Sequence, residues 1–177
     1  MDISEAQADV RRVYRAGFPG PAVSAVVWAA SNAVFLWGST AAGMLVLFVG
    51  GMLIFPLTTL VLSVMGGPAS LPKGHPSTSL AMQSAFTVPF GLLVAIVLGA
   101  YEPALFFPAS LIIVGAHYLV FVSLYGMRLF AVLAAVLIAL GTLVLFLLPS
   151  LGGISGWLGA AVFAIFAVIL FRAARAH

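Results

Sequence analysis

The sequence predicts an all-α integral membrane protein: a polytopic transmembrane bundle of six spanning helices, preceded by a short amphipathic helix on the membrane surface. Hydrophobic residues make up 64% of the 177-residue chain and charged residues only 6%, which leaves too few polar side chains to cover a soluble domain. The apolar residues also fall into six runs, close to the 20 or so residues that a helix needs to cross a bilayer. We therefore expect residues 1–177 to form a single integral membrane domain.

The first element, residues 1–19, is expected to be a cytoplasmic amphipathic helix. Asp2 and Ser4 are its two candidate N-caps. Its apolar residues recur at three- and four-residue spacing: Ile3, Ala6, Val10 and Val13. Basic side chains near its end suit the helix dipole, and together with a lysine of a later loop they are expected to contact lipid headgroups: Arg11, Arg12, Arg15 and Lys73. A partner-binding helix is the alternative.

The six membrane spans are separated by short turns. We place them at residues 21–37, 40–65, 77–100, 103–125, 129–148 and 156–171. Pro56 in the second span and Pro89 in the third predict kinks. Glu102 stands where it would cap the fourth span, with Pro103 in the first turn, and this role is favoured over a catalytic one. The loop with Lys73 and His75 is interpreted as a plain turn.

The basic residues predict the orientation of the chain. If the six spans alternate, every Lys and Arg lies on one side, and the three opposite turns carry none: Arg11, Arg12, Arg15, Lys73, Arg128, Arg172 and Arg175. Because cytoplasmic loops are enriched in basic residues, both termini are expected in the cytoplasm. Aromatic residues also stand at the predicted span ends, as an interfacial belt requires: Trp37, Tyr101, Tyr125 and Trp157.

The fourth span carries the sharpest candidate for a functional site, His117. It is the one titratable side chain that the sequence places deep in hydrocarbon, and such residues suggest function. Counting 1.5 Å per helical residue puts Asn32, Thr87 and His117 near the membrane midplane. We expect a ligand-binding polar cavity lined by His117, Asn32, Thr87 and Tyr118, with Gln83 near its cytoplasmic side. For His117 itself, a neutral imidazole bonded to Asn32, a hydroxyl or a carbonyl is favoured over a proton- or ligand-handling role.

Small residues at four-residue spacing predict close helix contacts in three spans. The rows are Ala25, Ala29 and Ala33 in the first span, Ala131, Ala135 and Ala139 in the fifth, and Gly152, Gly156, Ala160 and Ala164 at the sixth. Most are interpreted as contacts within the chain, and a homo-oligomer face is the alternative for one of them.

Several kinds of chemistry are disfavoured by the residues present. There is no cysteine, and only one histidine is expected inside the membrane, so no metal site is predicted. No Asp lies in a span, which leaves no carboxylate for a catalytic dyad or triad there. The chain offers no phosphate-binding glycine loop and no basic cluster on a soluble surface. We therefore expect no cofactor and no nucleic-acid partner.

Three stretches together resemble a family of small bacterial integral membrane proteins of unknown function. They are GAHYLVF at residues 115–121, the run from Pro56 through GGPASLPKG at 66–74 and SLAMQ at 79–83, and LYGMRLFAVLA at 124–134. The resemblance implies a multi-pass protein of the bacterial cytoplasmic (inner) membrane. It implies no activity, substrate or catalytic residue.

For function, the sequence favours a binding or transport protein for a small or lipophilic molecule, with its cavity around His117. A non-catalytic structural or partner-binding membrane protein is the first alternative, supported by the sparse polar residues and the rows of small residues. A membrane enzyme is the second, and it ranks last because general acid–base catalysis usually needs a further positioned titratable group. The expected partners are the bilayer itself, a lipid or lipophilic ligand, and in one alternative a second copy of the chain.

Overall fold

The computed structural model describes residues 2–175, and all regular structure in that range is helical. The seven α-helices are α1 (Ile3–Val13), α2 (Pro19–Trp37), α3 (Thr40–Val64), α4 (Ser77–Tyr101), α5 (Phe106–Tyr125), α6 (Leu129–Leu147) and α7 (Ser155–Arg175). Three short 3-10 turns join them: η1 (Arg15–Gly17), η2 (Pro103–Leu105) and η3 (Pro149–Ile154). Helices α2 to α7 are each long and apolar enough to cross a membrane, which confirms the predicted fold class.

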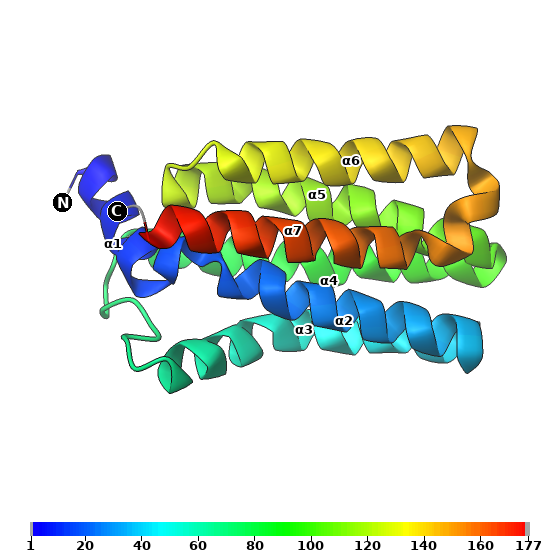
Figure 1. Ribbon diagram of the computed structural model, residues 1–177, viewed down its shortest axis with the longest axis horizontal. Helices are drawn as coiled ribbons and strands as arrows, with labels where there is room; N and C mark the ends of the chain where they lie inside the picture. The colour runs from blue at the N-terminus through cyan, green and yellow to red at the C-terminus, as the bar shows by residue number, and fades with distance from the viewer. Residues whose placement is uncertain (1, 176–177) are drawn as a thin grey trace.

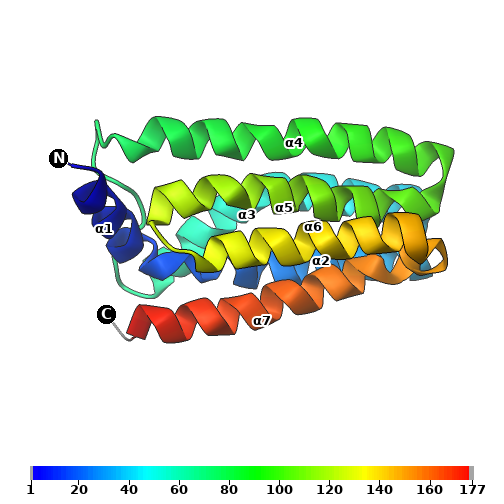
Figure 2. The same ribbon diagram turned by 90° about the horizontal axis from the view of Figure 1, so that it is seen from above.

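The six long helices lie alongside one another, and α1 covers the end of the bundle at which the chain also finishes (Figure 1). Helix α5 packs against α4, α6 and α7, and half of its apolar stretch is buried (50%). Helices α3 and α4 bury far less, 11% and 17% of theirs. Figure 2 shows α4 at the outer edge of the bundle. The firmly packed part of the protein is therefore built around α5.

An aromatic core fills the space between α2, α5 and α7. The Trp28 ring lies 5.6 Å from Phe163 and 6.2 Å from Phe107, and all three side chains are almost fully buried. Nearer the end covered by α1, Phe130 of α6 stacks on Tyr118 at 6.2 Å. Because aromatic pairs add to the packing contacts that hold helices together in lipid, this core fixes the positions of four helices.

Small residues allow the predicted close contacts at the start of α7, but not in α6. Gly152 of η3 meets the backbone of Ala104 in η2, and Gly156 of α7 packs on the Phe107 ring. In α6, by contrast, Ala135 and Ala139 face outward and line a groove of about 670 Å³ on the outer side of the helix. The row of alanines in α6 therefore makes no close contact with another helix within residues 2–175 at Ala135 and Ala139.

The helix ends confirm two predicted caps. Asp2 begins α1 with a capping box, in which its carboxylate accepts a hydrogen bond from the Glu5 amide at 2.8 Å and the Glu5 side chain accepts one from the Asp2 amide. Glu102 caps η2, because its Oε1 accepts from the Ala104 amide at 3.4 Å. Of the residues predicted to form an aromatic belt, Trp37, Tyr101 and Trp157 are exposed, as a belt requires. The prediction fails for Tyr125, which is buried against Phe121 and Phe130.

Helix α1 turns onto the bundle through a strained segment. Arg15 and Ala16 adopt left-handed backbone angles, with φ of 48° and 53°. Such angles cost a residue other than glycine about 1 kcal/mol or more. The apolar face of α1, formed by Ala6, Val10 and Val13, is buried against the protein, whereas Ile3 is exposed. This helix therefore packs on the helix ends of its own chain.

Candidate functional site

His117 lies on the side of α5 that faces α4. The two helices run antiparallel and close together, since Gly91 of α4 packs on Ile113 and Gly99 packs on Phe106. One level further along this seam, the Ser84 hydroxyl lies 2.9 Å from His117 Nδ1. The hydroxyl donates if Nδ1 is the bare ring nitrogen and accepts if Nδ1 carries the proton. The prediction that a hydroxyl could satisfy this histidine is therefore met by Ser84.

The second ring nitrogen of His117, Nε2, makes no hydrogen bond to residues 2–175. The buried polar side-chain atoms without a partner in this range are Thr58 Oγ1 and His75 Nε2. His117 Nε2 is not one of them, so it reaches the surface of the bundle. Around it the ring meets aromatic neighbours of its own helix, Tyr118 at 5.6 Å and Phe121 at 4.9 Å. The candidate site is thus His117 Nε2, a hydrogen-bonding atom without a partner in the described chain, beside the rings of Tyr118 and Phe121.

Ser84 was not among the predicted site residues, although a pattern in α4 identifies its position. Small residues of α4 that face its neighbours lie seven, four and four residues apart along one side of the helix: Ser84, Gly91, Ala95 and Gly99. Following that row toward the start of the helix leads to Ser84. Thr87 stands three residues after Ser84 and four before Gly91, but it is exposed and donates to the Ser84 carbonyl at 2.7 Å; Gln83 lies off the row and is also exposed. The structure therefore does not bring these two side chains to the histidine.

Tyr118 follows His117 in the chain but faces the core. Its side chain is buried, and its hydroxyl is directed at the Ser24 hydroxyl of α2. On the other side, the ring packs against Phe163 at 5.9 Å. Tyr118 therefore fixes the rotation of α5 relative to α2 and thereby holds His117 toward α4.

Asn32 lies far from His117, which corrects the expectation that the two share one cavity. Its Nδ2 donates to the Gly153 carbonyl at 2.8 Å, and its Oδ1 accepts from the Trp157 amide at 2.8 Å. Gly156 packs between Asn32 and the Phe107 ring, so Asn32 lies at the level of Phe107. Ten residues separate Phe107 from His117, or about 15 Å along the helix. Counting residues placed Asn32 too deep, because α2 ends at Trp37, five residues or about 8 Å beyond Asn32.

Two hollows in the surface of the bundle also lie away from His117. The first is the groove on α6 described above. The second, of about 540 Å³, lies between α3 and α4 at the end opposite α1, and its lining includes Thr40, Met44 and Gly99. Neither is lined by His117. His117 therefore lies outside both hollows, at the seam where α5 meets Ser84 of α4.

Helix α1 closes one end of the bundle through polar contacts with helix C-termini. Gln7 donates to the Ser123 carbonyl at 2.8 Å, and Arg11 donates to the Tyr125 carbonyl at 2.5 Å. Arg15 donates to the Met65 carbonyl at 2.9 Å. These carbonyls lie at the ends of α5 and α3, where helices lack internal donors and the dipole favours cations. Arg11 and Arg15, predicted to contact lipid headgroups, are thus engaged by the protein.

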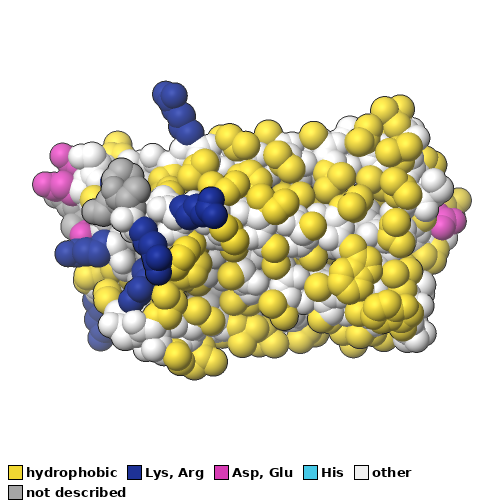
Figure 3. All heavy atoms as spheres, in the orientation of Figure 1, with side chains coloured by type: hydrophobic (Ala, Val, Ile, Leu, Met, Phe, Trp, Pro, Cys, Tyr) yellow, Lys and Arg dark blue, Asp and Glu magenta, His cyan; other side chains and the backbone are white. Residues whose placement is uncertain are grey.

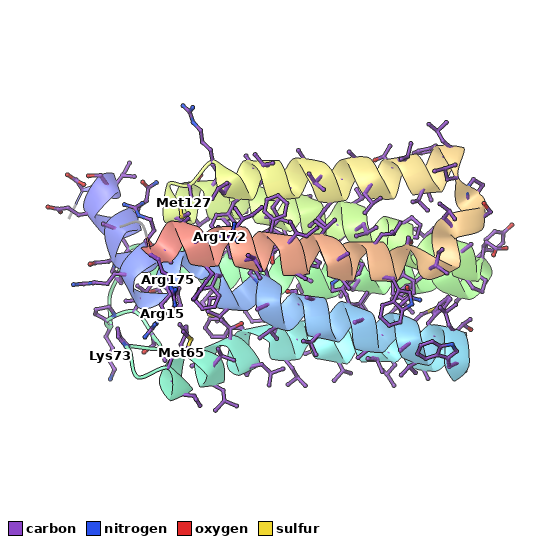
Figure 4. All side chains as sticks on the ribbon, in the orientation of Figure 1. Arg15, Met65, Lys73, Met127, Arg172 and Arg175 are labelled. Carbon is purple, nitrogen blue, oxygen red and sulfur yellow. The ribbon has the colours of Figure 1, made fainter. Side chains whose placement is uncertain are left out.

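The other two residues of that set remain exposed. Arg12 forms an ion pair with Asp9 at 2.6 Å, and its side chain is 75% exposed. Lys73 projects from the loop between α3 and α4, as Figure 4 shows. The sequence predicted the same headgroup contact for all four cations. In the structure, Arg11 and Arg15 bond to backbone carbonyls, whereas Arg12 and Lys73 are exposed.

The loop between α3 and α4 is pinned beneath α1 by a buried histidine. His75 Nδ1 accepts a hydrogen bond from the Ser77 amide at 3.2 Å, so the proton of the neutral ring lies on Nε2. That nitrogen faces Asp9 Oδ2 at 3.8 Å. Nearby, burial raises the pKa of the Tyr14 phenol above its usual value, while a hydrogen bond to the Leu71 backbone acts in the opposite direction. This loop, predicted as a plain turn, is therefore packed in place.

All four carboxylates of the chain lie at the two ends of the bundle. Asp2, Glu5 and Asp9 belong to α1 or its cap, and Glu102 stands at the opposite end. Among the described residues, no group of three His, Asp or Glu side chains is placed to hold a metal ion. At the level of His117 the available chemistry is hydrogen bonding by imidazole and hydroxyl groups.

Comparison with known proteins places the chain in a family. Residues 3–173 match a protein family described as "Family of unknown function (DUF7010)", and the chain belongs to that family. The resemblance to an uncharacterised membrane protein family is therefore confirmed. No curated protein matches the chain. No solved structure matches it either.

Proposed function

We propose that this protein binds a lipophilic molecule with one hydrogen-bonding group, at His117 in the seam between α4 and α5. The observation that carries the proposal is the open Nε2 of His117, whose other nitrogen is held by Ser84 at 2.9 Å. A hydrogen-bonding atom that faces hydrocarbon without a partner is costly, and a bound group would remove that cost. An apolar body of the ligand would lie among the aromatic and aliphatic side chains beside it.

The location of the site favours entry from the bilayer. Helix α4 contacts α5 more than any other helix and buries only 17% of its apolar stretch. Its interior Pro89 removes one backbone hydrogen bond near the site. Transport across the membrane would additionally require α4 to move away from α5. The gathering of basic residues at the α1 end (Figure 3) supports an orientation with both termini in the cytoplasm. A bacterial cytoplasmic membrane is proposed from the family resemblance alone.

A structural or partner-binding role is the second candidate, and the small burial of α3 and α4 favours it. Large side chains on α4 face outward, among them Phe86 at 58% exposure and Phe90 at 67%. A partner helix packed there would bury them.

Native mass spectrometry of the protein released from its own membrane tests both candidates. The variants are His117→Phe and, as a matched control, Ser110→Ala, which removes a buried hydroxyl of α5 that bonds only to the Phe106 carbonyl of its own helix. Binding at His117 predicts a retained small molecule in the wild type and in Ser110→Ala that is lost in His117→Phe. A molecule retained equally by all three would contradict the assignment of the site. A protein that retains no small molecule but stays bound to a second polypeptide would favour the structural role.

A further inference from the structure

A cationic patch covers the α1 end of the bundle where α7, η1 and the loop between α3 and α4 meet. We propose that this patch, formed by Lys73, Arg172 and Arg175 around Arg15, binds the headgroup of an anionic phospholipid. Figure 4 shows the four side chains at this end of the bundle. The site is separate from His117 and does not depend on the function proposed above.

Packing brings the three segments together. The Arg175 guanidinium lies over the Phe171 ring at 4.3 Å, and Phe171 packs edge to face on Phe18 at 5.0 Å. Phe18 directly follows η1, which itself contacts α7. On its other side, Arg15 lies against Gly67 of the loop that carries Lys73. Cations from three distant parts of the sequence are thereby held on one surface.

Across the part of the chain that the structure describes, no carboxylate is paired with the patch. Within residues 2–175, Lys73, Arg172 and Arg175 form no ion pair. Asp9 of α1 is paired with Arg12 at 2.6 Å. Asp2 and Glu5 bond to each other's backbone in the capping box, and Glu102 lies at the far end of the bundle. The patch is therefore complementary to an anion.

The surroundings favour a lipid over a soluble anion. The patch borders membrane-spanning helices whose side chains face outward, such as Val64 of α3 at 80% exposure and Val168 of α7 at 52%. Figure 3 shows the dark blue cations directly beside this hydrophobic surface. An amphiphile can place its phosphate against the cations while its acyl chains follow the helices, which a free anion cannot do. Each Lys or Arg at such a surface contributes about 1 kcal/mol to attraction of anionic lipid.

The experiment compares the full-length protein in vesicles of pure phosphatidylcholine and in vesicles containing one third phosphatidylglycerol, followed by native mass spectrometry of the lipids that stay bound. The wild type should retain phosphatidylglycerol in preference to phosphatidylcholine. Arg172→Gln and Lys73→Gln should each lower that preference about fivefold. Arg128→Gln is the matched control, since it removes the same charge from the exposed turn between α5 and α6.

Three results would overturn the proposal. The first is equal retention of the two lipids by the wild type. The second is an effect of Arg128→Gln as large as that of Arg172→Gln, which would indicate attraction by net charge alone. The third is displacement of the bound lipid by millimolar inorganic phosphate, which would identify a site for a free anion. Because none of these variants touches His117, failure here leaves the proposed function in place.

Discussion

Replacing Asn32 with alanine should destabilise the protein more than any other single polar substitution in α2. The Asn32 side chain is fully buried and caps α7 from a different helix. Its Oδ1 accepts from the Trp157 amide, which lies in the first turn of α7 and has no partner within that helix, and its Nδ2 donates to the Gly153 carbonyl. In Asn32→Ala both backbone groups lose their partner.

The magnitude follows from counting the groups left unpaired. A buried donor or acceptor without a partner costs about 1–3 kcal/mol, so two of them cost roughly 2–6 kcal/mol. Hydrogen bonds measured between membrane helices average about 0.6 kcal/mol, because the unfolded state in lipid finds other partners. The lower end of the range, about 2 kcal/mol, is therefore the expected loss.

Ser31→Ala supplies a matched control in the neighbouring residue. Ser31 is also fully buried, and its hydroxyl donates to the Gly43 carbonyl of α3 at 2.8 Å. That carbonyl already lies inside a helix and keeps its backbone partner. Loss of the hydrogen bond from Ser31 should therefore cost about 1 kcal/mol or less. Reversible unfolding of both variants in mixed micelles, followed by circular dichroism, measures the difference. If Asn32→Ala costs no more than Ser31→Ala, the capping argument is refuted.

Two further predictions concern packing and pH. Gly43→Ala should cost about 1–3 kcal/mol in the same unfolding assay, because the new methyl group would run into the backbone of Phe35, whereas Gly20→Ala meets no atom within 4 Å and should be neutral or slightly stabilising. For α1, hydrogen bonds from the Glu5 amide and the Ser4 hydroxyl lower the pKa of Asp2 below its usual value of 3.8. A lowered pKa in the folded state means that the capping contribution is present above pH 3.8 and is lost as the pH falls through the lowered value. Amide exchange of α1 should accelerate in that acidic range in the wild type and show no such step in Asp2→Asn, and a step of equal size in the variant would contradict this.

The spans were predictable because the signal for a membrane helix is local. A run of apolar residues crosses a bilayer whatever its neighbours are, and caps such as Asp2 and Glu102 depend on residues two or three positions away. Partners across helices depend on the rotation and register of two helices. The sequence therefore placed Asn32 and His117 together by their depth alone. In the structure, Asn32 bonds to the Gly153 carbonyl of η3, and His117 bonds to Ser84 of α4. Tyr125 was mistaken for a belt residue, because its position at a helix end does not reveal that α1 covers that end.

Hydrogen bonds across the bundle are unevenly distributed, which bears on how the proposed site would work. Asn32 joins α2 to the start of α7. Gln7 and Arg11 of α1 bond to the end of α5, and Arg15 of η1 bonds to the end of α3. Within residues 2–175, the Ser84–His117 contact is the one side-chain hydrogen bond between α4 and another helix. A ligand at His117 therefore binds next to the contact that holds α4 against α5.

The hydroxyl of Ser84 suits this position because it both donates and accepts. A ligand that offers an acceptor requires a proton on Nε2, and Nδ1 then accepts from Ser84. A ligand that offers a donor requires a bare Nε2, and Nδ1–H then donates to Ser84. In either case the α4–α5 contact survives binding, whereas a fixed acceptor such as a carbonyl would permit only the second tautomer. Ser84→Ala should consequently loosen α4 with or without ligand, which amide exchange of α4 in the wild type and the variant would reveal.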